Sequence, residues 1–188
     1  MKYILTISMA LLVLNTLVAQ INSFPYIEDF ESQSNCGTAC AGPCNLSGGW
    51  ENAQNNTQDW LVNQGGTTSL NTGPSQDHNP GSTSGNYLYT ETSGCTNGTA
   101  NLLSPNFDFS LMTNPTVGFW YHMFGAAMGD MHFDIDTGTG WINNVIPSWT
   151  DNVDQWKYRE INLTNWAAFN PNVRFRVRGE TGTTFTSD

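Results

Sequence analysis

Stretches in which apolar and polar residues alternate constrain the fold of this chain more than any other feature of its sequence. Residues 173–179 read Val, Arg, Phe, Arg, Val, Arg and Gly, so the apolar side chains face one way and three arginines the other. Residues 131–136 repeat the pattern with Met, Phe and Ile on one face. A helical period is hard to find, since the best candidate, residues 163–169, covers only about two turns before Pro171. The alternation therefore predicts a protein built of β-strands.

Other segments add strands and turns to this pattern. Residues 116–124 are apolar on both faces, which is typical of a central strand of a sandwich. Asn and Thr together account for 44 of the 188 residues, and glycine-rich turns such as residues 137–140 recur. We therefore expect an all-β fold, a two-sheet antiparallel jelly-roll β-sandwich. The remaining strand candidates are residues 24–32, 59–62, 86–91, 100–103, 141–142 and 156–163.

The first 19 residues have the form of a secretory signal peptide. Lys2 precedes an interrupted apolar run that ends in the small-residue site Leu17-Val18-Ala19. The run is too broken to be a convincing membrane span, and no later segment has 18 consecutive apolar residues. The sequence predicts a secreted or cell-surface protein with no membrane insertion, in which residues 20–188 form one domain.

Charge is distributed unevenly. The formal net charge is −10, and residues 20–156 contain 13 Asp or Glu and no Lys or Arg. Binding to nucleic acid requires cations that neutralise phosphates, so a nucleic-acid partner is excluded. The acidic residues are offset by solvent, by the late arginines or by a bound cation, and solvent accounts for most of them.

Four cysteines, Cys36, Cys40, Cys44 and Cys95, suit an oxidising compartment. Three disulfide connectivities are possible, and in each of them Cys95 joins one cysteine of the cluster while the other two pair locally. A zinc site is the alternative, but the spacing in an exported chain favours disulfides.

Short motifs in a fixed order run through most of the chain. They are Phe30-Glu31, Gly49-Trp50, Asp59-Trp60, Thr72-Gly73-Pro74-Ser75-Gln76-Asp77-His78, Gly85-Asn86-Tyr87-Leu88-Tyr89, Leu103-Ser104-Pro105 and residues 119–125. In this order they resemble the MAM domain, the extracellular module of meprins, neuropilins and some receptor phosphatases. The chain departs from the animal pattern in its closely spaced cysteines and in Asp29, which stands where a cysteine usually precedes Phe-Glu. In this it is more similar to secreted bacterial relatives.

The resemblance implies a non-catalytic adhesion or recognition module with a structural Ca²⁺ ion. Its ligands would be Glu31 and Asp77, with Asp59 as a weaker candidate, since Ca²⁺ takes six to eight oxygen ligands. The alternative for Asp77 is that it caps its own loop. The resemblance also implies that the chain is a fragment, because the final acidic strand of the family, with a further ligand, would begin at Ser187-Asp188.

Other polar residues allow competing hypotheses. His132, Asp134 and Asp136 share one strand face and could form a second metal site, but a solvated face is favoured. His122 is expected to be a hydrogen-bonded core histidine, and His78 a loop organiser. No Gly-x-Ser-x-Gly or His-Glu-x-x-His motif occurs, and nothing selects a carboxylate pair for glycoside hydrolysis, so we expect no enzymatic activity in this segment.

The partner class is left open between two alternatives. The first is an extracellular protein or glycan recognised by an adhesion module, with other domains of the same longer chain beside it. The second is a carbohydrate-binding module accessory to a secreted hydrolase or protease. Trp141 and Trp149 lie near turns and are the tryptophans expected to be exposed for ligand contact.

Overall fold

The computed structural model describes residues 20–188; the predicted signal peptide lies outside the described residues. In this part of the chain, no helix is long and apolar enough to cross a membrane. The described elements are strands β1 (Glu51–Asn52), β2 (Leu61–Gln64), β3 (Asn86–Tyr89), β4 (Thr99–Leu103), β5 (Thr116–Met123), β6 (Met131–Asp136), β7 (Trp141–Ile142), β8 (Val153–Asn162) and β9 (Arg174–Glu180), and helix α1 (Thr164–Ala167).

Five strands form an antiparallel sheet in the order β1-β4-β9-β6-β7. The alternation in β6 and β9 decides which face is buried, because Phe133, Ile135 and Phe175 are at most 6% exposed. Leu102 of β4 is buried on the same face, opposite Val177. The arginines of β9 occupy the other face, as the sequence predicts.

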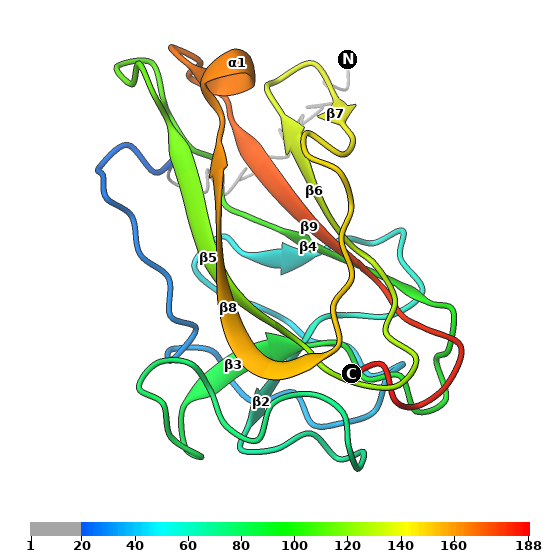
Figure 1. Ribbon diagram of the computed structural model, residues 1–188. Helices are drawn as coiled ribbons and strands as arrows, with labels where there is room; N and C mark the ends of the chain where they lie inside the picture. The colour runs from blue at the N-terminus through cyan, green and yellow to red at the C-terminus, as the bar shows by residue number, and fades with distance from the viewer. Residues whose placement is uncertain (1–19) are drawn as a thin grey trace, which may run out of the picture.

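Two separate antiparallel pairs cover the buried face of this sheet. β5 pairs with β8, and β2 pairs with β3. Figure 1 shows β5 and β8 lying in front of β9 and β6, with β2 and β3 at the lower end. Tyr121 and Met123 of β5 join Phe133 and Phe175 in the main core. The protein is therefore an all-β antiparallel sandwich, in which one layer is made of two short pairs.

The predicted first strand, residues 24–32, is wrong. No strand is assigned within these residues, and Phe30 has a positive φ of 61°. Glu28 Oε1 accepts the backbone N–H of Phe30, and Asp29 Oδ1 accepts that of Glu31. These local side-chain acceptors replace the backbone partners that a strand would need.

The prediction that β5 is a central strand is also wrong. Within the described residues β5 pairs only with β8, and Trp120 on its outer face is 47% exposed. Apolar residues on the outer face of an edge pair are not explained by the core. They mark a surface that is available for contact.

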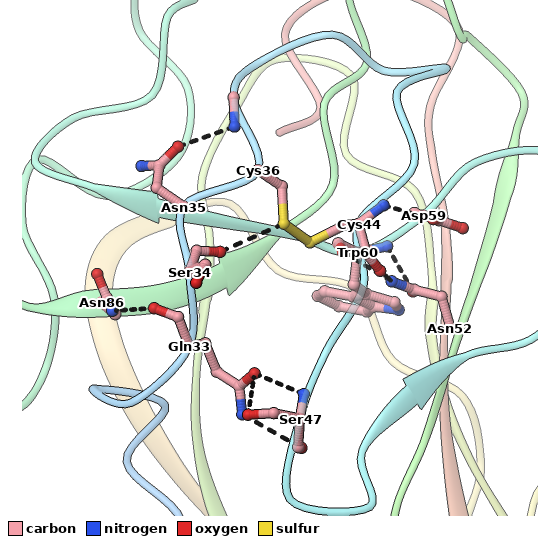
Figure 2. The surroundings of a disulfide bond; sticks show 11 residues. Gln33, Ser34, Asn35, Cys36, Cys44, Ser47, Asn52, Asp59, Trp60 and Asn86 are labelled. Atoms are coloured by element: carbon pink, nitrogen blue, oxygen red, sulfur yellow. Dashed lines mark hydrogen bonds between the residues drawn. A yellow bond between two sulfur atoms is a disulfide. The ribbon is translucent and has the colours of Figure 1, made fainter.

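Two disulfides hold the irregular segment before β1. Cys36 pairs with Cys44 and Cys40 with Cys95, so Cys95 joins the cluster as expected. Around the first bridge, Asp59 Oδ2 accepts the N–H of Cys44 at 2.9 Å (Figure 2). The second bridge ties the segment to the turn between β3 and β4, so a region without regular structure is fixed to the sandwich.

Candidate binding site

The outer face of the β5–β8 pair carries exposed aromatic side chains. Trp120 of β5 lies opposite Tyr158 of β8, with ring centroids 5.4 Å apart. Tyr158 is 53% exposed, and its hydroxyl lies over Gly118, where a Cβ would come within 1.9 Å of it. Glycine at this position therefore allows the tyrosine to lie flat across the neighbouring strand.

The long loop between β2 and β3 supplies a third aromatic group. His78 stacks on Trp120 with ring centroids 3.8 Å apart and planes inclined by 19°. Trp156 of β8 lies edge-on to His78 and donates its indole N–H to Gln76 O at 3.0 Å. The Asp77-His78 motif is thus fixed to the β5–β8 pair. His78 contacts Trp120 and Trp156 of the β5–β8 pair and so supports the exposed indole of Trp120.

A cavity of about 680 Å³ lies next to these aromatic residues. Its lining includes Tyr87 and Leu88 of β3 and Val117 and Phe119 of β5, and it reaches Val177 on the buried face of the large sheet. In the described residues, no backbone hydrogen bond joins β3 to β5. The cavity therefore lies where the two pairs of the second layer fail to meet, and its walls are predominantly apolar.

A second cluster brings Glu31 and Asp77 to the start of β3. Glu31 Oε1 accepts the backbone N–H of Asn86 at 2.8 Å, and Asp77 Oδ2 packs against Gly85 so closely that a Cβ there would lie 2.1 Å away. Asp77 Oδ1 accepts the N–H of Ser82 at 2.6 Å, so Asp77 also caps its own loop. The two carboxylates therefore contact consecutive residues, Asp77 at Gly85 and Glu31 at Asn86.

Two buried oxygens in this cluster have no donor in the described part of the chain. They are Asp77 Oδ2 and Asn86 Oδ1, in residues that are 2% and 7% exposed. The Asn86 amide nitrogen is satisfied by the carbonyl groups of Phe30, Glu31 and Gln33, so its orientation is fixed. Buried oxygens without donors are costly unless a cation or water meets them.

Asp59 lies apart from this cluster. Its Oδ2 is bonded to the Cys44 amide, beside the disulfide. Among residues 20–188, Glu31, Asp59 and Asp77 do not bring their ligand atoms within 4.8 Å of one another. The structure therefore places Glu31 and Asp77 beside Gly85 and Asn86 at the start of β3 and leaves Asp59 as a support of the cysteine loop.

The sequence model of one family, described as MAM domain, meprin/A5/mu, matches residues 29–185. The chain belongs to the MAM domain family. Neuropilin-1a of Danio rerio is 40% identical over 74 residues, which cover 39% of this chain and 8% of that protein. The match therefore spans a small part of the relative's length.

Two solved structures are similar to this MAM domain at low sequence identity. The K1 cleaved adhesin domain of Lys-gingipain from Porphyromonas gingivalis W83 has a TM-score of 0.44 and 12% identity, over 81% of this chain and 93% of the other. The K3 domain of the same protein has a TM-score of 0.42 and 13% identity, over 73% and 85%.

Trp141 and Trp149, the tryptophans expected to be exposed, do not belong to the exposed aromatic group around Trp120. Trp149 is 9% exposed and belongs to the main core, where the Arg159 guanidinium lies 4.2 Å from its ring centroid, so the expectation of exposure is wrong. An isolated antiparallel bridge joins the backbone of Trp149 to Met131 at the start of β6. Trp141 is half-buried under Arg176, 4.6 Å from the ring centroid. Sequence reasoning missed Trp120 because its strand was assigned to the core.

His122 is hydrogen bonded, as the sequence predicts. Its Nε2 lies 3.1 Å from Asp154 Oδ1, and its ring lies edge-on to Trp156. Burial lowers the pKa of His122, while the contact with Asp154 acts in the opposite direction. His122 thus packs against the indole of Trp156.

A buried carboxylate that sequence reasoning did not select lies at Asp188. Its Oδ1 accepts the N–H of Thr92 at 2.9 Å. Burial, opposed by the hydrogen bond from the Thr92 N–H and assisted by the nearby Glu91 carboxylate, raises the pKa of Asp188 to about 6. Burial likewise raises the pKa of Tyr87 to about 12, so its hydroxyl remains a donor, to Gly65 O at 2.7 Å. The order of the motifs does not predict the hydrogen bond between Asp188 and Thr92, which lie 96 residues apart.

Proposed function

We propose that this MAM domain is a non-catalytic, extracellular recognition module of a secreted or cell-surface protein. Membership of the family and the similarity to a neuropilin support this function. The observation that carries the proposal is the aromatic face, defined as His78, Trp120, Trp156 and Tyr158. A partner would cover this face, and other domains of a longer chain would carry any further activity.

The aromatic face has the properties of an interaction hot spot. Large, rigid Trp and Tyr side chains bury much area with little loss of rotamer freedom, and they dominate binding energy where they are well supported. Trp120 is supported by His78, which restricts its motion in the unbound protein. Asp154 and Glu160 are exposed on the same strand as Tyr158. The favoured partner is a protein surface with apolar groups flanked by basic ones, because charges of opposite sign assist association.

A glycan is the second candidate ligand. Exposed aromatic rings beside a cavity also suit the apolar face of a sugar ring. In this case the domain would be a carbohydrate-binding module accessory to a secreted hydrolase or protease. A protein partner and a glycan would both contact Trp120. A substitution at Trp120 therefore cannot distinguish them, and the class of ligand has to be found by testing proteins and glycans separately.

We expect Trp120→Ala to weaken partner binding by about 30-fold, because truncating a central hot-spot residue costs at least about 2 kcal/mol. The measurement is surface plasmon resonance of residues 20–188 against a panel of extracellular proteins, with a glycan array read in parallel. Hits on the protein panel support the adhesion function, and hits on the glycan array alone support the carbohydrate-binding alternative.

Phe169→Ala is the matched control, because Phe169 is 62% exposed but follows α1, outside the aromatic face. It should leave affinity unchanged. Equal loss of binding in Trp120→Ala and Phe169→Ala would contradict the assignment of the binding surface. A blank result on both panels at high protein concentration would count against the recognition function.

We also propose that Glu31, Asp77 and Asn86 hold a structural Ca²⁺ ion. The residues fit the ion because every side-chain atom that they would offer is an oxygen, the preferred ligand of hard cations. Asp77 Oδ2 and Asn86 Oδ1 have no donor among the described residues, so the ion would satisfy both. The ion would tie the segment before β1 to the start of β3.

Calcium should raise the thermal stability of the metal-stripped protein. At about 100 times the dissociation constant, a ligand that binds only the folded state adds about 2.7 kcal/mol. For a domain of this size, that corresponds to a rise in Tm of roughly 5–10 °C. Differential scanning calorimetry of stripped protein with and without CaCl₂ measures the shift.

Asp77→Asn tests the site while preserving the loop cap, since the amide oxygen can still accept the Ser82 N–H. This variant should lose most of the calcium-dependent shift. Asp108→Asn is the control, because half-buried Asp108 caps Ser110 in a similar way but lies outside the cluster. A Tm that does not respond to calcium in the unaltered protein would contradict the proposed ion.

A further inference from the structure

Paired charges cross the solvent face of the large sheet between β6 and β9, and their pattern breaks at one end. In register, Asp136 faces Arg174, Asp134 faces Arg176, and His132 faces Arg178. The next pair is Asp130 opposite Glu180, whose backbones are joined by the Glu180 N–H donating to Asp130 O at 2.8 Å. Two carboxylates directly opposite each other are destabilising unless a cation lies between them.

His132 occupies the same face as this acidic pair. His132 is only 7% exposed, and its Nδ1 lies 2.8 Å from Asn144 Oδ1. The same oxygen accepts a hydrogen bond from Arg178 Nη2 at 3.3 Å, so it is an acceptor, and His132 Nδ1 must carry the proton. This fixes the tautomer of the neutral imidazole and leaves Nε2 with a free lone pair.

That lone pair has no partner in the described residues. Nε2 lies 3.3 Å from Glu180 Oε1, which is also an acceptor. One ligand atom each from Asp130, His132 and Glu180 lie within 4.8 Å of one another. A buried imidazole nitrogen and two carboxylates therefore converge, and a cation bound among them would stabilise this arrangement.

We propose that Asp130, His132 and Glu180 bind a divalent transition-metal ion, with Zn²⁺ as the ion that this ligand set suits. Imidazole nitrogen with carboxylate oxygen is a typical zinc ligand set, whereas Ca²⁺ and Mg²⁺ prefer oxygen alone. Asn144 acts as the outer partner that orients the imidazole, as is usual for metal-bound histidines. Three protein ligands leave a fourth position for water or for a group from a binding partner.

The neighbouring charges explain why the site is at this end of the sheet. Asp134 is fully committed, because its oxygens accept Arg176 Nε at 2.8 Å and the Asn144 N–H at 2.8 Å. Asp136 caps the turn through Gly138 and Gly140. Arg178 Nη1 lies 2.6 Å from Glu180 Oε1, so it neutralises part of the acidic pair and competes with the ion for that oxygen. The second oxygen of Glu180 and the Asp130 carboxylate are the ones we assign to the ion.

Zinc binding to metal-stripped, disulfide-intact protein tests the site directly. We expect one Zn²⁺ per chain in a competition titration with a chromophoric chelator. Asp130→Asn and Glu180→Gln should each weaken binding at least about tenfold, by analogy with the loss seen when even outer partners are removed. Both side chains are at least partly exposed, so these variants should fold even if His132→Gln does not. The nitrogen NMR signal of His132 Nε2 should shift on addition of Zn²⁺, and that of Nδ1 should change little.

Asp154→Asn is the matched control, because Asp154 forms another histidine–carboxylate contact, with His122, but has no third ligand among residues 20–188. It should bind Zn²⁺ like the unaltered protein. Asp77→Asn should also leave zinc binding unchanged, which separates this site from the proposed calcium site. Unchanged affinity in both Asp130→Asn and Glu180→Gln, or no stoichiometric binding in the unaltered protein, would overturn the proposal.

Discussion

Replacing Asp134 by alanine is expected to lower the free energy of unfolding by about 3–5 kcal/mol, because it leaves buried charge without its partner. Asp134 is fully buried, and its Oδ2 lies 2.7 Å from Arg176 Nη2 and 3.5 Å from Arg178 Nε. The two arginine side chains are each only 18% exposed, so solvent cannot replace the carboxylate. Urea denaturation followed by tryptophan fluorescence measures the change.

Glu51→Ala is the matched control for this prediction. Glu51 pairs with Arg174 on the same face of the sheet, but its side chain is 56% exposed. Exposed ion pairs contribute about 0–1 kcal/mol, so this variant should remain within about 1 kcal/mol of the unaltered protein. Equal destabilisation in the two variants would mean that burial does not set the strength of these pairs.

Removing the Cys40–Cys95 disulfide as a pair of alanines is expected to cost about 4 kcal/mol. The bridge joins residues 55 apart in sequence, and a longer closed loop restricts the unfolded chain more. By the same relation, the Cys36–Cys44 bridge, which joins residues 8 apart, should contribute about 2.5 kcal/mol. Urea denaturation of the two double variants gives both values, and a larger loss for the short loop would contradict the chain-entropy account.

The sequence predicted the fold class and the later strands because their side chains alternate. The β6 and β9 alternations give the buried face correctly, since burying one face of a sheet fixes the register. Residues 24–32 failed because alternation is not sufficient where carboxylates can bond the nearby backbone. Glu28 and Asp29 do so, and no hydrophobic pattern records that competition.

The candidate sites could be predicted only in part. Asp77 was found through its motif, but Trp120 was assigned to the core because an edge strand with apolar residues on both faces has the same pattern as a central one. His132 was considered as a ligand together with Asp134 and Asp136, which share its strand face, whereas the proposed zinc site groups it with Asp130 and Glu180. Its partner Glu180 comes from a strand 48 residues later in the chain, and only the register of β6 with β9 reveals it.

The split in the second layer has a consequence for how the molecule moves. Because no backbone hydrogen bonds join β3 to β5 in the described residues, β3 can move away from β5 without breaking the ladder of either pair. The β2–β3 pair is held by the Cys36 N–H bonded to Val62 O, beside the short disulfide loop. Local opening at this seam would enlarge the 680 Å³ cavity while β5 and β8 stay paired. The size of a ligand admitted there is then set by the opening free energy of the four-residue strand β3, and not by the stability of the whole domain.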